Sequence, residues 1–233
     1  MHNIAIIPAR GGSQRIQKKN IKLFLDKPII AYSIENAFKS GIFDEIMVST
    51  DDPEIAKIAL EYGAKVPFFR SKKNSDNFAT TSDVLIEVLK KYEKNGVNFI
   101  NACCIYATSP LLSEKKILEA EELLIKNNLD CVFPIVQTNF PVERSLKITP
   151  SHLVSMNYPE HINTRSQDLV SSYFDAGQFY FFNVSEFLKN KKLWTSKTGS
   201  IIIKRIEAQD IDDETDWALA ELKYKYLKEN NLI

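Results

Sequence analysis

Short apolar runs alternate with helical patterns from the first residues of this chain to about residue 136. Each run is too short for a helix and is apolar throughout, which is typical of a strand buried on both faces of a sheet. The patterns between the runs place apolar residues every three or four positions, as amphipathic helices do. This alternation favours the α/β class, with a mostly parallel sheet and helices on both of its faces. The expected strands are 4–7, 46–48, 66–69, 99–106 and 131–136.

Residues that favour the start or end of a helix mark the expected helix boundaries. Pro28 opens the first helix and Gly41 ends it, and Gly63 ends the second. A third helix follows the cap-forming residues 80–83, and Ser113 caps a fourth. Ligands of such sheets bind beyond the carboxyl ends of the strands, so we expect function in the loops there. These loops follow Ile7, Val48 and Tyr106.

The alternation stops between residues 137 and 175, where prolines and polar turns replace the helices. We interpret this segment as an inserted arm of β-hairpins that reaches toward substrate or a second subunit. Strands are expected again at 177–184 and 201–206, and a last helix begins near Glu214. The length fits one α/β domain over residues 1–233 that includes the arm.

The composition restricts the possible partners. Thirty basic residues balance thirty acidic ones and 44% of the chain is hydrophobic, which is typical of a folded globular protein without a general attraction to nucleic acid. No apolar run approaches the roughly 20 residues needed to span a bilayer, so no membrane partner is expected. Without a signal-peptide pattern, the expected location is the cytoplasm. Cys103, Cys104 and Cys131 lie in apolar runs, and we expect them to be buried thiols.

The loop after the first strand is rich in glycine and positive charge. Gly11 and Gly12 let the backbone approach a ligand and turn its N–H groups inward, as an anion site requires. The loop also has four cations and no carboxylate; the cations are Arg10, Arg15, Lys18 and Lys19. Such a loop suits a triphosphate, and the alternative is a solvated basic turn. No glycine occurs between Gly12 and Gly41, which excludes the dinucleotide fingerprint and the P-loop.

Five carboxylates gather near the C-terminus, between residues 210 and 216. In an extended segment Asp210 and Asp212 point to the same side and can reach one ion. Two carboxylates together with nucleotide phosphates suit Mg²⁺, which keeps several waters. The alternative is an acidic helix start capped by Thr215, with Glu214 and Asp216 favoured by the helix dipole. We assign Asp210 and Asp212 to metal, assign Glu214 and Asp216 to the helix, and leave Asp213 undecided.

Four motifs in order along the chain resemble those of the sugar-acid cytidylyltransferases, the CMP-sialic acid synthetase family. They are residues 4–20, 48–52, 107–111 and 210–216. The resemblance implies a three-layer, Rossmann-like nucleotidyltransferase fold, with CTP as substrate, Mg²⁺ as cofactor and a homodimer as the assembly. It also implies catalytic roles for Arg10, Lys19, Asp210 and Asp212. The nucleotide-binding residues that it implies are Ala9, Arg10, Gly11, Gly12, Ser13, Arg15, Lys19, Asn20, Arg70 and Ser82.

Two departures from the sialic acid enzymes concern the sugar. Tyr106 replaces a usual Gln, and residues 173–180 look like those of the pseudaminic acid cytidylyltransferases, which serve bacterial surface and flagellar glycosylation. Asp175 and Gln178 in this segment can bond a polar sugar. Arg165 or Arg144 in the arm could pair with the sugar carboxylate. In the phosphate loop, Gln14 stands where many relatives carry Lys, and Arg15 could supply the charge.

The reaction expected from this resemblance transfers CMP from CTP to the anomeric hydroxyl of a nine-carbon 2-keto sugar acid, pseudaminic acid, and releases pyrophosphate. Legionaminic, sialic or 3-deoxy-manno-octulosonic acid is the alternative acceptor. Alternatives of another class are a glycosyltransferase of similar fold and a non-catalytic nucleotide-binding module. A glycosyltransferase of similar fold would carry an Asp-x-Asp motif after a central strand. At that position this chain has Tyr106-Ala107-Thr108-Ser109 instead. All roles require the early cationic loop and the late aspartates to meet around one CTP.

Overall fold

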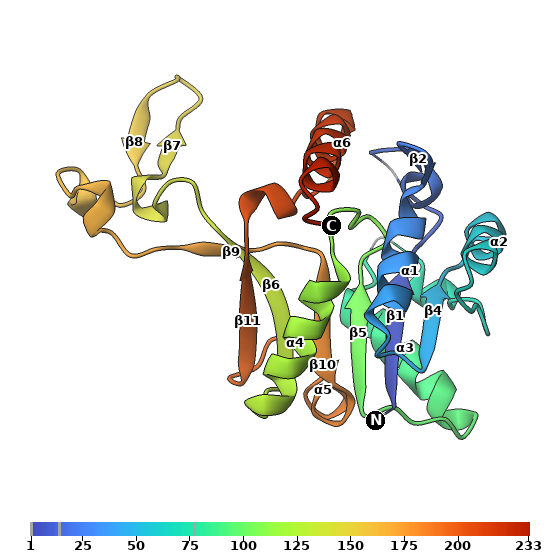
Figure 1. Cartoon of the computed structure of the whole chain (residues 1–233). Coiled ribbons are helices and arrows are strands. Elements are labelled where there is room, and N and C mark those ends of the chain that lie inside the picture. Colours follow the sequence, from blue (N-terminus) through green and yellow to red (C-terminus); the bar gives the residue numbers. More distant parts are fainter. Residues whose placement is uncertain (1, 14, 77) are drawn as a thin grey trace.

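A computed structural model describes residues 2–13, 15–76 and 78–233 of the chain. Its described residues form a seven-stranded sheet in the order β11-β6-β10-β5-β1-β4, with β9 also paired to β6 (Figure 1). The pairs β1–β4, β1–β5 and β6–β11 are parallel, whereas β9 and β10 run antiparallel to their neighbours. The mostly parallel sheet is therefore confirmed. Its strands are β1 (Asn3–Pro8), β4 (Glu45–Ser49), β5 (Asn101–Ile105), β6 (Cys131–Gln137), β9 (Tyr173–Asp175), β10 (Phe179–Asn183) and β11 (Thr198–Ile203).

Helices cover both faces of the sheet, as the alternation predicts. One buried cluster joins the sheet to α1 (Ile29–Ser40), α2 (Pro53–Glu61) and α4 (Glu114–Lys126). A second cluster joins the opposite face to α3 (Thr81–Lys94) and α5 (Val184–Asn190). The sheet is thus the middle of three layers. The short α5, whose N-cap is Asn183, was not expected from the sequence.

The caps explain where the helices begin and end. Pro28 precedes α1, and Gly41 ends it with a φ of 68°, a left-handed conformation that glycine adopts without strain. Thr80 and Asp83 form a reciprocal capping box at the start of α3. The last helix, α6 (Glu214–Glu229), is capped by Asp213. The alternative of Thr215 as its cap is therefore wrong, because the Asp213 carboxylate accepts the N–H groups of the first turn.

One expected strand is missing, and the strand expected at 201–206 lies three residues earlier, at Thr198–Ile203. In the described part of the chain, residues 66–69 form no strand, and only the neighbouring Lys65 bridges to Met47 of β4. Pro67 in this segment lacks the N–H group that a ladder needs. β11 ends at Ile203 because a 3₁₀ turn, Arg205–Glu207, follows it.

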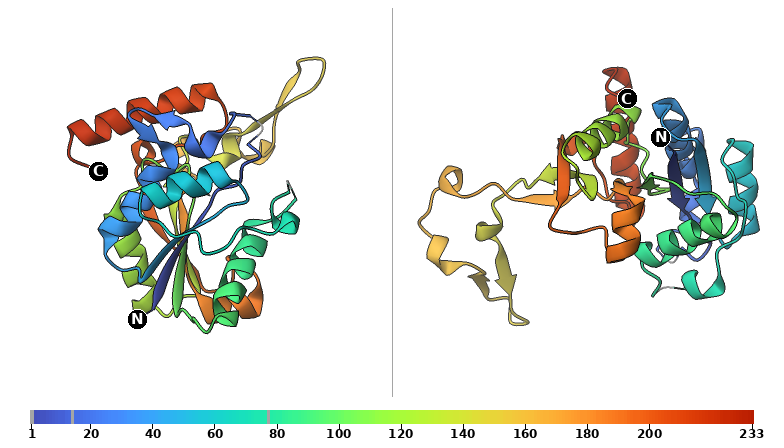
Figure 2. Two further views of the ribbon diagram at one scale, coloured as in Figure 1. Left: turned by 90° about the vertical axis from the view of Figure 1, so that its right-hand side faces the viewer. Right: turned by 90° about the horizontal axis from the view of Figure 1, so that it is seen from below.

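The arm extends away from the sheet in all views (Figures 1 and 2). The chain leaves through β6 and returns through β9, so the segment outside the sheet is 138–172 rather than 137–175. Its hairpin consists of the three-residue strands β7 (Leu146–Ile148) and β8 (Val154–Met156). The arm also contains three 3₁₀ turns, at Val142–Arg144, Pro159–His161 and Ser166–Asp168.

The strand order places a crevice beside β1. The chain passes from β1 to β4 through α1, and from there back to β5 through α3 on the opposite face. From β1 the chain leads to β4 on one side, whereas from β5 it leads through α4 to β6 on the other side. The loops after β1 and β5 therefore diverge at the carboxyl ends of these strands, where open α/β sheets bind ligands. α6 lies across this end of the sheet (Figure 2, left).

A third apolar cluster fixes α6 beside the segment that follows the β1 loop. Phe24 belongs to the small ribbon of β2 (Leu23–Phe24) and β3 (Lys27–Pro28), and its ring meets that of Trp217 edge-on at 5.6 Å between centroids. Ile211, immediately before α6, is buried in the same cluster. The early loop and the late aspartates therefore lie side by side. The cluster consists of Ile16, Phe24, Ile29, Tyr32, Ile211, Trp217 and Ala220.

Two further expectations concern the rest of the chain. Cys103, Cys104 and Cys131 are buried free thiols, and burial raises the pKa of each of them. Within the described ranges, no helix is both long and apolar enough to cross a bilayer.

Candidate active site

A cavity of about 310 Å³ opens between the carboxyl ends of β1 and β5. The β1 loop forms one wall, the N-terminus of α3 forms another, and the residues after β5 close the third side. Both polar side chains and apolar surface line it, as a nucleotide requires. The lining residues are Pro8, Arg10, Ser13, Arg15, Ile16, Lys19, Asn20, Arg70, Ala79, Thr80, Thr81, Val84, Tyr106, Ala107 and Thr108.

The two glycines of the β1 loop lie beside this lining rather than in it. The Gly11 N–H donates to Asp51 Oδ1 at 3.1 Å, so a carboxylate of the chain already accepts it. A Cβ on Gly11 would lie 2.6 Å from Asp52 Oδ2, and Asp52 cannot move freely because it caps α2. No residue with a Cβ fits at this position, so the close approach of the segments that follow β1 and β4 requires a glycine, Gly11. Gly12 is exposed, with open space where its Cβ would lie.

The backbone of the loop is fixed at both ends. The Ala9 N–H donates to Ser49 O at 2.9 Å, and the Ser13 N–H donates to Gly11 O at 3.0 Å. Asn20, which is buried, donates from Nδ2 to Arg10 O at 2.9 Å and so closes the loop. The predicted nucleotide residues Ser13 and Asn20 both reach the cavity wall, and Ala9 lies buried behind it.

Three of the four predicted cations face the cavity. Arg10 donates from Nη1 to Asp76 O at 3.0 Å, across the opening. Lys19 is half-buried, and this burial lowers the pKa of its ammonium group although nearby Asp212 opposes the effect. The fourth cation, Lys18, pairs with Glu54 on α2 and does not line the cavity. Gln14, which departs from the family pattern, lies outside the described residues.

The late acidic segment contacts this cationic wall. Arg15 Nη1 lies 2.5 Å from Asp212 Oδ2, and Lys19 Nζ donates to Ile211 O at 2.7 Å. Asp210, two residues earlier, is exposed on the same stretch of chain. Segments about 190 residues apart in the sequence are thus brought to one place, as the sequence-based hypothesis requires.

The donor set at this place fits a magnesium ion that shares its ligands with a nucleotide. The described residues contain no cluster of three or more Asp, Glu, His or Cys side chains that could enclose a metal. Mg²⁺ commonly takes one or two carboxylates, with phosphate oxygens and water as its other ligands. Asp210 and Asp212, two residues apart in an extended stretch, meet that requirement. Asp212 pairs with Arg15, so its negative charge is balanced without a metal.

Arg70 is buried, although it follows the end of an apolar segment where an exposed side chain would be usual. Its relative exposure is 9%, and this burial lowers the pKa of the guanidinium. Nε donates to Ser49 Oγ at 3.1 Å and Nη2 donates to Ser49 O. Arg70 is thus held at the base of the cavity by the end of β4. The predicted Ser82 is not among the described lining residues, and its neighbours Thr80 and Thr81 take that place.

Tyr106 and Asp175, two of the predicted sugar residues, form one group with Tyr180, whereas the side chain of Gln178 donates to Glu207 O and lines neither cavity. Tyr106 lines the cavity, and burial raises the pKa of its hydroxyl to about 12. Its ring meets the ring of Tyr180 at 6.0 Å, and the Tyr180 hydroxyl donates to Asp175 Oδ2. Gln178 is buried, and its backbone oxygen accepts the Tyr106 N–H at 2.9 Å. Asp175 also borders a second cavity of about 640 Å³, which Asp210 borders as well.

Arg144 and Arg165 do not join this group. Arg144 donates to Thr164 O at 2.5 Å and to Ile162 O at 3.3 Å, which ties one part of the arm to another. Arg165 pairs with Asp168 at 2.8 Å on the surface of the arm. Neither is among the described residues that line the two cavities. Within one chain, therefore, the arm does not deliver these side chains to the site.

Comparison with known proteins agrees with this geometry. The model of a family described as cytidylyltransferase matches residues 4–224. The chain is 40% identical over 225 residues to a pseudaminic acid cytidylyltransferase of Campylobacter jejuni subsp. jejuni, with 97% of each chain covered. This chain belongs to the cytidylyltransferase family. It is therefore a nucleotidyltransferase and not a glycosyltransferase.

Two further proteins are similar to this chain, one in sequence and one in fold. A CMP-N,N'-diacetyllegionaminic acid synthase of Legionella pneumophila is 34% identical, with 95% of each chain covered. A solved structure of a CMP:2-keto-3-deoxy-manno-octonic acid synthetase complexed with CTP has a TM-score of 0.70 at 16% identity, covering 98% of this chain and 100% of that one. The latter confirms the three-layer nucleotidyltransferase fold.

The sequence did not reveal several residues of this cytidylyltransferase site. Thr81 bonds the Tyr106 hydroxyl at 3.2 Å between oxygens, and Thr108 lines the cavity. Thr81 lies in the cap-forming run 80–83, so a helix start facing the crevice was the available signal. Asp216 accepts the Asp213 N–H at 3.2 Å within the capping box of α6 and also accepts the Asp212 N–H at 3.0 Å, a contact beyond capping that only the tertiary structure reveals.

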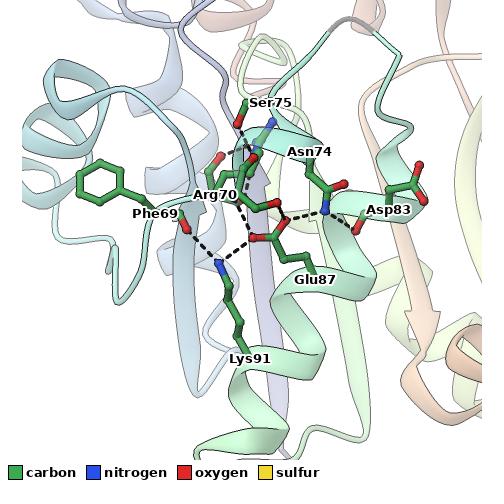
Figure 3. A network of polar contacts seen from close by, with 9 residues as sticks. Phe69, Arg70, Asn74, Ser75, Asp83, Glu87 and Lys91 are labelled. Carbon is green, nitrogen blue, oxygen red and sulfur yellow. Dashed lines mark hydrogen bonds and ion pairs between the residues drawn. The ribbon is translucent and has the colours of Figure 1, made fainter.

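A polar network centred on Glu87 of α3 holds the chain that follows Arg70 (Figure 3). Glu87 accepts from the Ser71 N–H at 2.8 Å, from Asn74 Nδ2 at 2.5 Å and from Lys91 Nζ at 2.6 Å. Lys91 also donates to Phe69 O at 2.9 Å, on the other side of Arg70. Burial raises the pKa of Glu87, but these hydrogen bonds outweigh it and bring the pKa down to about 2. The charged carboxylate therefore stabilises the segment that carries Arg70.

The Glu87 network predicts a specific pH dependence of stability. Because the pKa is about 2 in the folded chain and 4.5 ordinarily, the contribution is complete above about pH 5 and is lost as the pH falls toward 2. Glu87→Gln should lower the unfolding free energy in urea by about 1–3 kcal/mol at neutral pH. The difference in unfolding free energy between this variant and the unaltered chain should shrink toward zero as the pH falls from about 5 to about 2. Glu93→Gln, exposed on the same helix, is the control, and a constant difference across this range would contradict the assignment.

Proposed function

We propose that this cytidylyltransferase transfers CMP from CTP to the anomeric hydroxyl of a nine-carbon 2-keto sugar acid, and that this acid is pseudaminic acid. The observation that carries the proposal is the contact between the cationic β1 loop and the Asp210–Asp212 stretch at the edge of one cavity. The 40% identity to a pseudaminic acid enzyme along nearly the whole chain supports the choice of acceptor. The product would serve surface and flagellar glycosylation.

CTP would occupy the cavity between β1 and β5. Arg10, Arg15 and Lys19 would contact its phosphates, since guanidinium and ammonium groups offset phosphate charge and donate hydrogen bonds to its oxygens. The cytosine would lie toward the buried Arg70 and the capped start of α3. The partial burial of Lys19 strengthens its interaction with phosphate, because less water screens the charge.

The anomeric oxygen would attack the α-phosphorus in line with the bond to the β-phosphate. A new phosphorus–oxygen bond forms to the sugar, the bond to the bridging oxygen breaks, and pyrophosphate leaves with the electron pair, while the anomeric hydroxyl gives up its proton to water. Negative charge grows on the leaving oxygens, where Arg10, Arg15 and Lys19 are positioned to stabilise it. Holding both reactants in this geometry supplies much of the remaining rate enhancement. No covalent enzyme intermediate is needed.

Asp210 and Asp212 would hold a magnesium ion at the edge of the nucleotide cavity. Such an ion, when bound, supplies positive charge that polarises the phosphate undergoing attack. The sugar acid would lie on the same side, near Tyr106 and Asp175. Tyr106 presents a weakly acidic hydroxyl, and Asp175 is oriented by Tyr180 and by the Gly177 N–H at 2.8 Å. Gln178 supports Tyr106 through its backbone.

Loss of the Asp212 charge should abolish most of the turnover without unfolding the chain. Removal of one preorganised electrostatic group typically costs about 10²–10³ in rate. Asp212→Asn should therefore slow pyrophosphate release about a hundredfold or more, while the melting temperature stays close to that of the unaltered chain. Glu214→Gln, a nearby exposed carboxylate paired with Lys22, is the control and should retain activity. Near-normal turnover by Asp212→Asn would contradict the assignment.

The acceptor is tested by measuring CTP-dependent pyrophosphate release with a panel of sugar acids. The panel contains pseudaminic, legionaminic, sialic and 3-deoxy-manno-octulosonic acids at equal concentrations. We expect kcat/KM to be highest for pseudaminic acid, by about tenfold or more, since unpaired polar groups discriminate strongly against a wrong sugar. A preference for another acid would replace the proposed acceptor. CTP binding without turnover of any acid would indicate a non-catalytic nucleotide-binding module.

We also propose that the chain is a single cytidylyltransferase domain whose arm is the contact surface of a homodimer. The arm exposes several large apolar side chains, which is unusual for a surface that remains in water. They include Phe140, Ile148, Leu153, Ile162 and Val170. A second copy would cover them, and could bring Arg144 or Arg165 near the partner's sugar. A cytoplasmic location agrees with the buried free thiols.

Light scattering tests the homodimer. The mass should be twice 26.7 kDa, because the exposed apolar surface of the arm favours association. Leu153→Asp introduces a charge at the hairpin of the arm and should shift the mass toward the monomer. Ser151→Asp, two residues away and exposed, is the matched control and should leave the mass unchanged. A monomeric mass for the unaltered chain would refute this part of the proposal.

A further inference from the structure

We propose that Lys223, Gln209 and Asp216 are positioning residues that hold the Asp210–Asp212 stretch in its working register. This inference rests on the proposed metal-binding role of those two aspartates. The three residues, named here the α6 clamp, connect the first and third turns of α6 to the chain just before it. The sequence predicted no role in the site for any of them, and it assigned Asp216 to the helix alone.

Lys223 directs its ammonium group at the backbone before Asp210. Nζ donates to Ala208 O at 2.6 Å, to Gln209 Oε1 at 2.9 Å and to Arg205 O at 3.2 Å. Among the described residues no carboxylate lies within ion-pair distance of it. Burial lowers the pKa of this group, so the three uncharged acceptors are what compensate its partial loss of water. All of them belong to the segment that leads into the aspartates.

Gln209 extends this hydrogen-bond network along the segment. Its Oε1 accepts from Lys223, and its Nε2 donates to Asp216 Oδ1 at 3.2 Å and to Asp210 O at 3.0 Å. The other carboxylate oxygen of Asp216 accepts the Asp212 N–H at 3.0 Å. A continuous path of hydrogen bonds therefore connects Lys223 to the backbone of both proposed metal ligands.

The opposite side of the segment is fixed independently. Lys19 donates to Ile211 O at 2.7 Å, and the Ile211 side chain is buried beside Trp217. With Ile211 pointing inward, Asp210 and Asp212 must point outward, because successive side chains of an extended segment alternate. A slip of one residue would bury a carboxylate and expose Ile211. The α6 clamp and Lys19 together oppose such a slip.

Helix capping alone does not explain the α6 clamp. The capping box of α6 needs only Asp213 and Asp216. Lys223 and Gln209 add nothing to the cap, yet five hydrogen bonds of their side chains end on the approach to Asp210 or on Asp216. Outer residues that orient metal ligands typically contribute about 10- to 100-fold in metal affinity or activity.

The test compares Lys223→Met, Lys223→Arg and the control Lys225→Met, an exposed lysine of the same helix. Binding of Mn²⁺ to the enzyme–CTP mixture is measured by electron paramagnetic resonance, which does not depend on turnover. Lys223→Met should weaken Mn²⁺ binding about tenfold and lower kcat to a similar extent, with the KM for the sugar acid within about twofold. Lys223→Arg, which keeps donors at this position, should recover most of both losses. Lys225→Met should match the unaltered chain.

Unchanged Mn²⁺ affinity in Lys223→Met would overturn the inference. A loss confined to the KM for the sugar acid would also overturn it, since Lys223 borders the 640 Å³ cavity and would then be an acceptor contact. If Lys223→Met does not fold, Gln209→Leu is measured in its place, with the same expected losses and the same refuting results. Asp212→Asn separates the two proposals. Its failure to weaken Mn²⁺ binding refutes the metal site itself, whereas weakened binding there and unchanged binding in Lys223→Met refute only the α6 clamp.

Discussion

The site depends on the packing of α6 across the carboxyl end of the sheet. Exposed ion pairs such as Arg15–Asp212 contribute about 0–1 kcal/mol and could not by themselves bring together segments so distant in the sequence. The edge-on rings of Phe24 and Trp217 and the buried Ile211 provide the larger stabilisation, because burial of each large apolar side chain is worth about 1.5–3 kcal/mol. Apolar packing therefore positions the charges, and the charges then determine what the crevice binds.

The polar groups around the crevice are largely occupied by one another, which keeps them in place without a ligand. Asp51 accepts the Gly11 N–H, and Asp212 balances Arg15. Ser49 receives the buried Arg70. Each of these contacts avoids the cost of an unsatisfied or unpaired group. A triphosphate entering such a site exchanges one set of acceptors for another and does not have to order the loop first.

Local patterns predicted the framework because each depends on neighbours in the sequence. The apolar runs of β1 and β5 and the capping box of Thr80 are of this kind, and they lie where expected. The outcomes that depend on distant partners could not be derived. Arg70 is buried because β4 supplies its acceptors. Thr81 rather than Ser82 lines the cavity, and Asp213 rather than Thr215 caps α6.

In the proposed reaction, the phosphate-facing loop and the aspartates serve a step that does not depend on the sugar. The group of Tyr106, Tyr180 and Asp175 is different, because its members contact one another. Tyr106 borders the first cavity and Asp175 borders the second. Exchange of one member alters the orientation of the others, because the Asp175 carboxylate accepts the Tyr180 hydroxyl. In the proposed function, acceptor choice resides in this coupled group, so single substitutions there should lose one sugar more readily than they gain another.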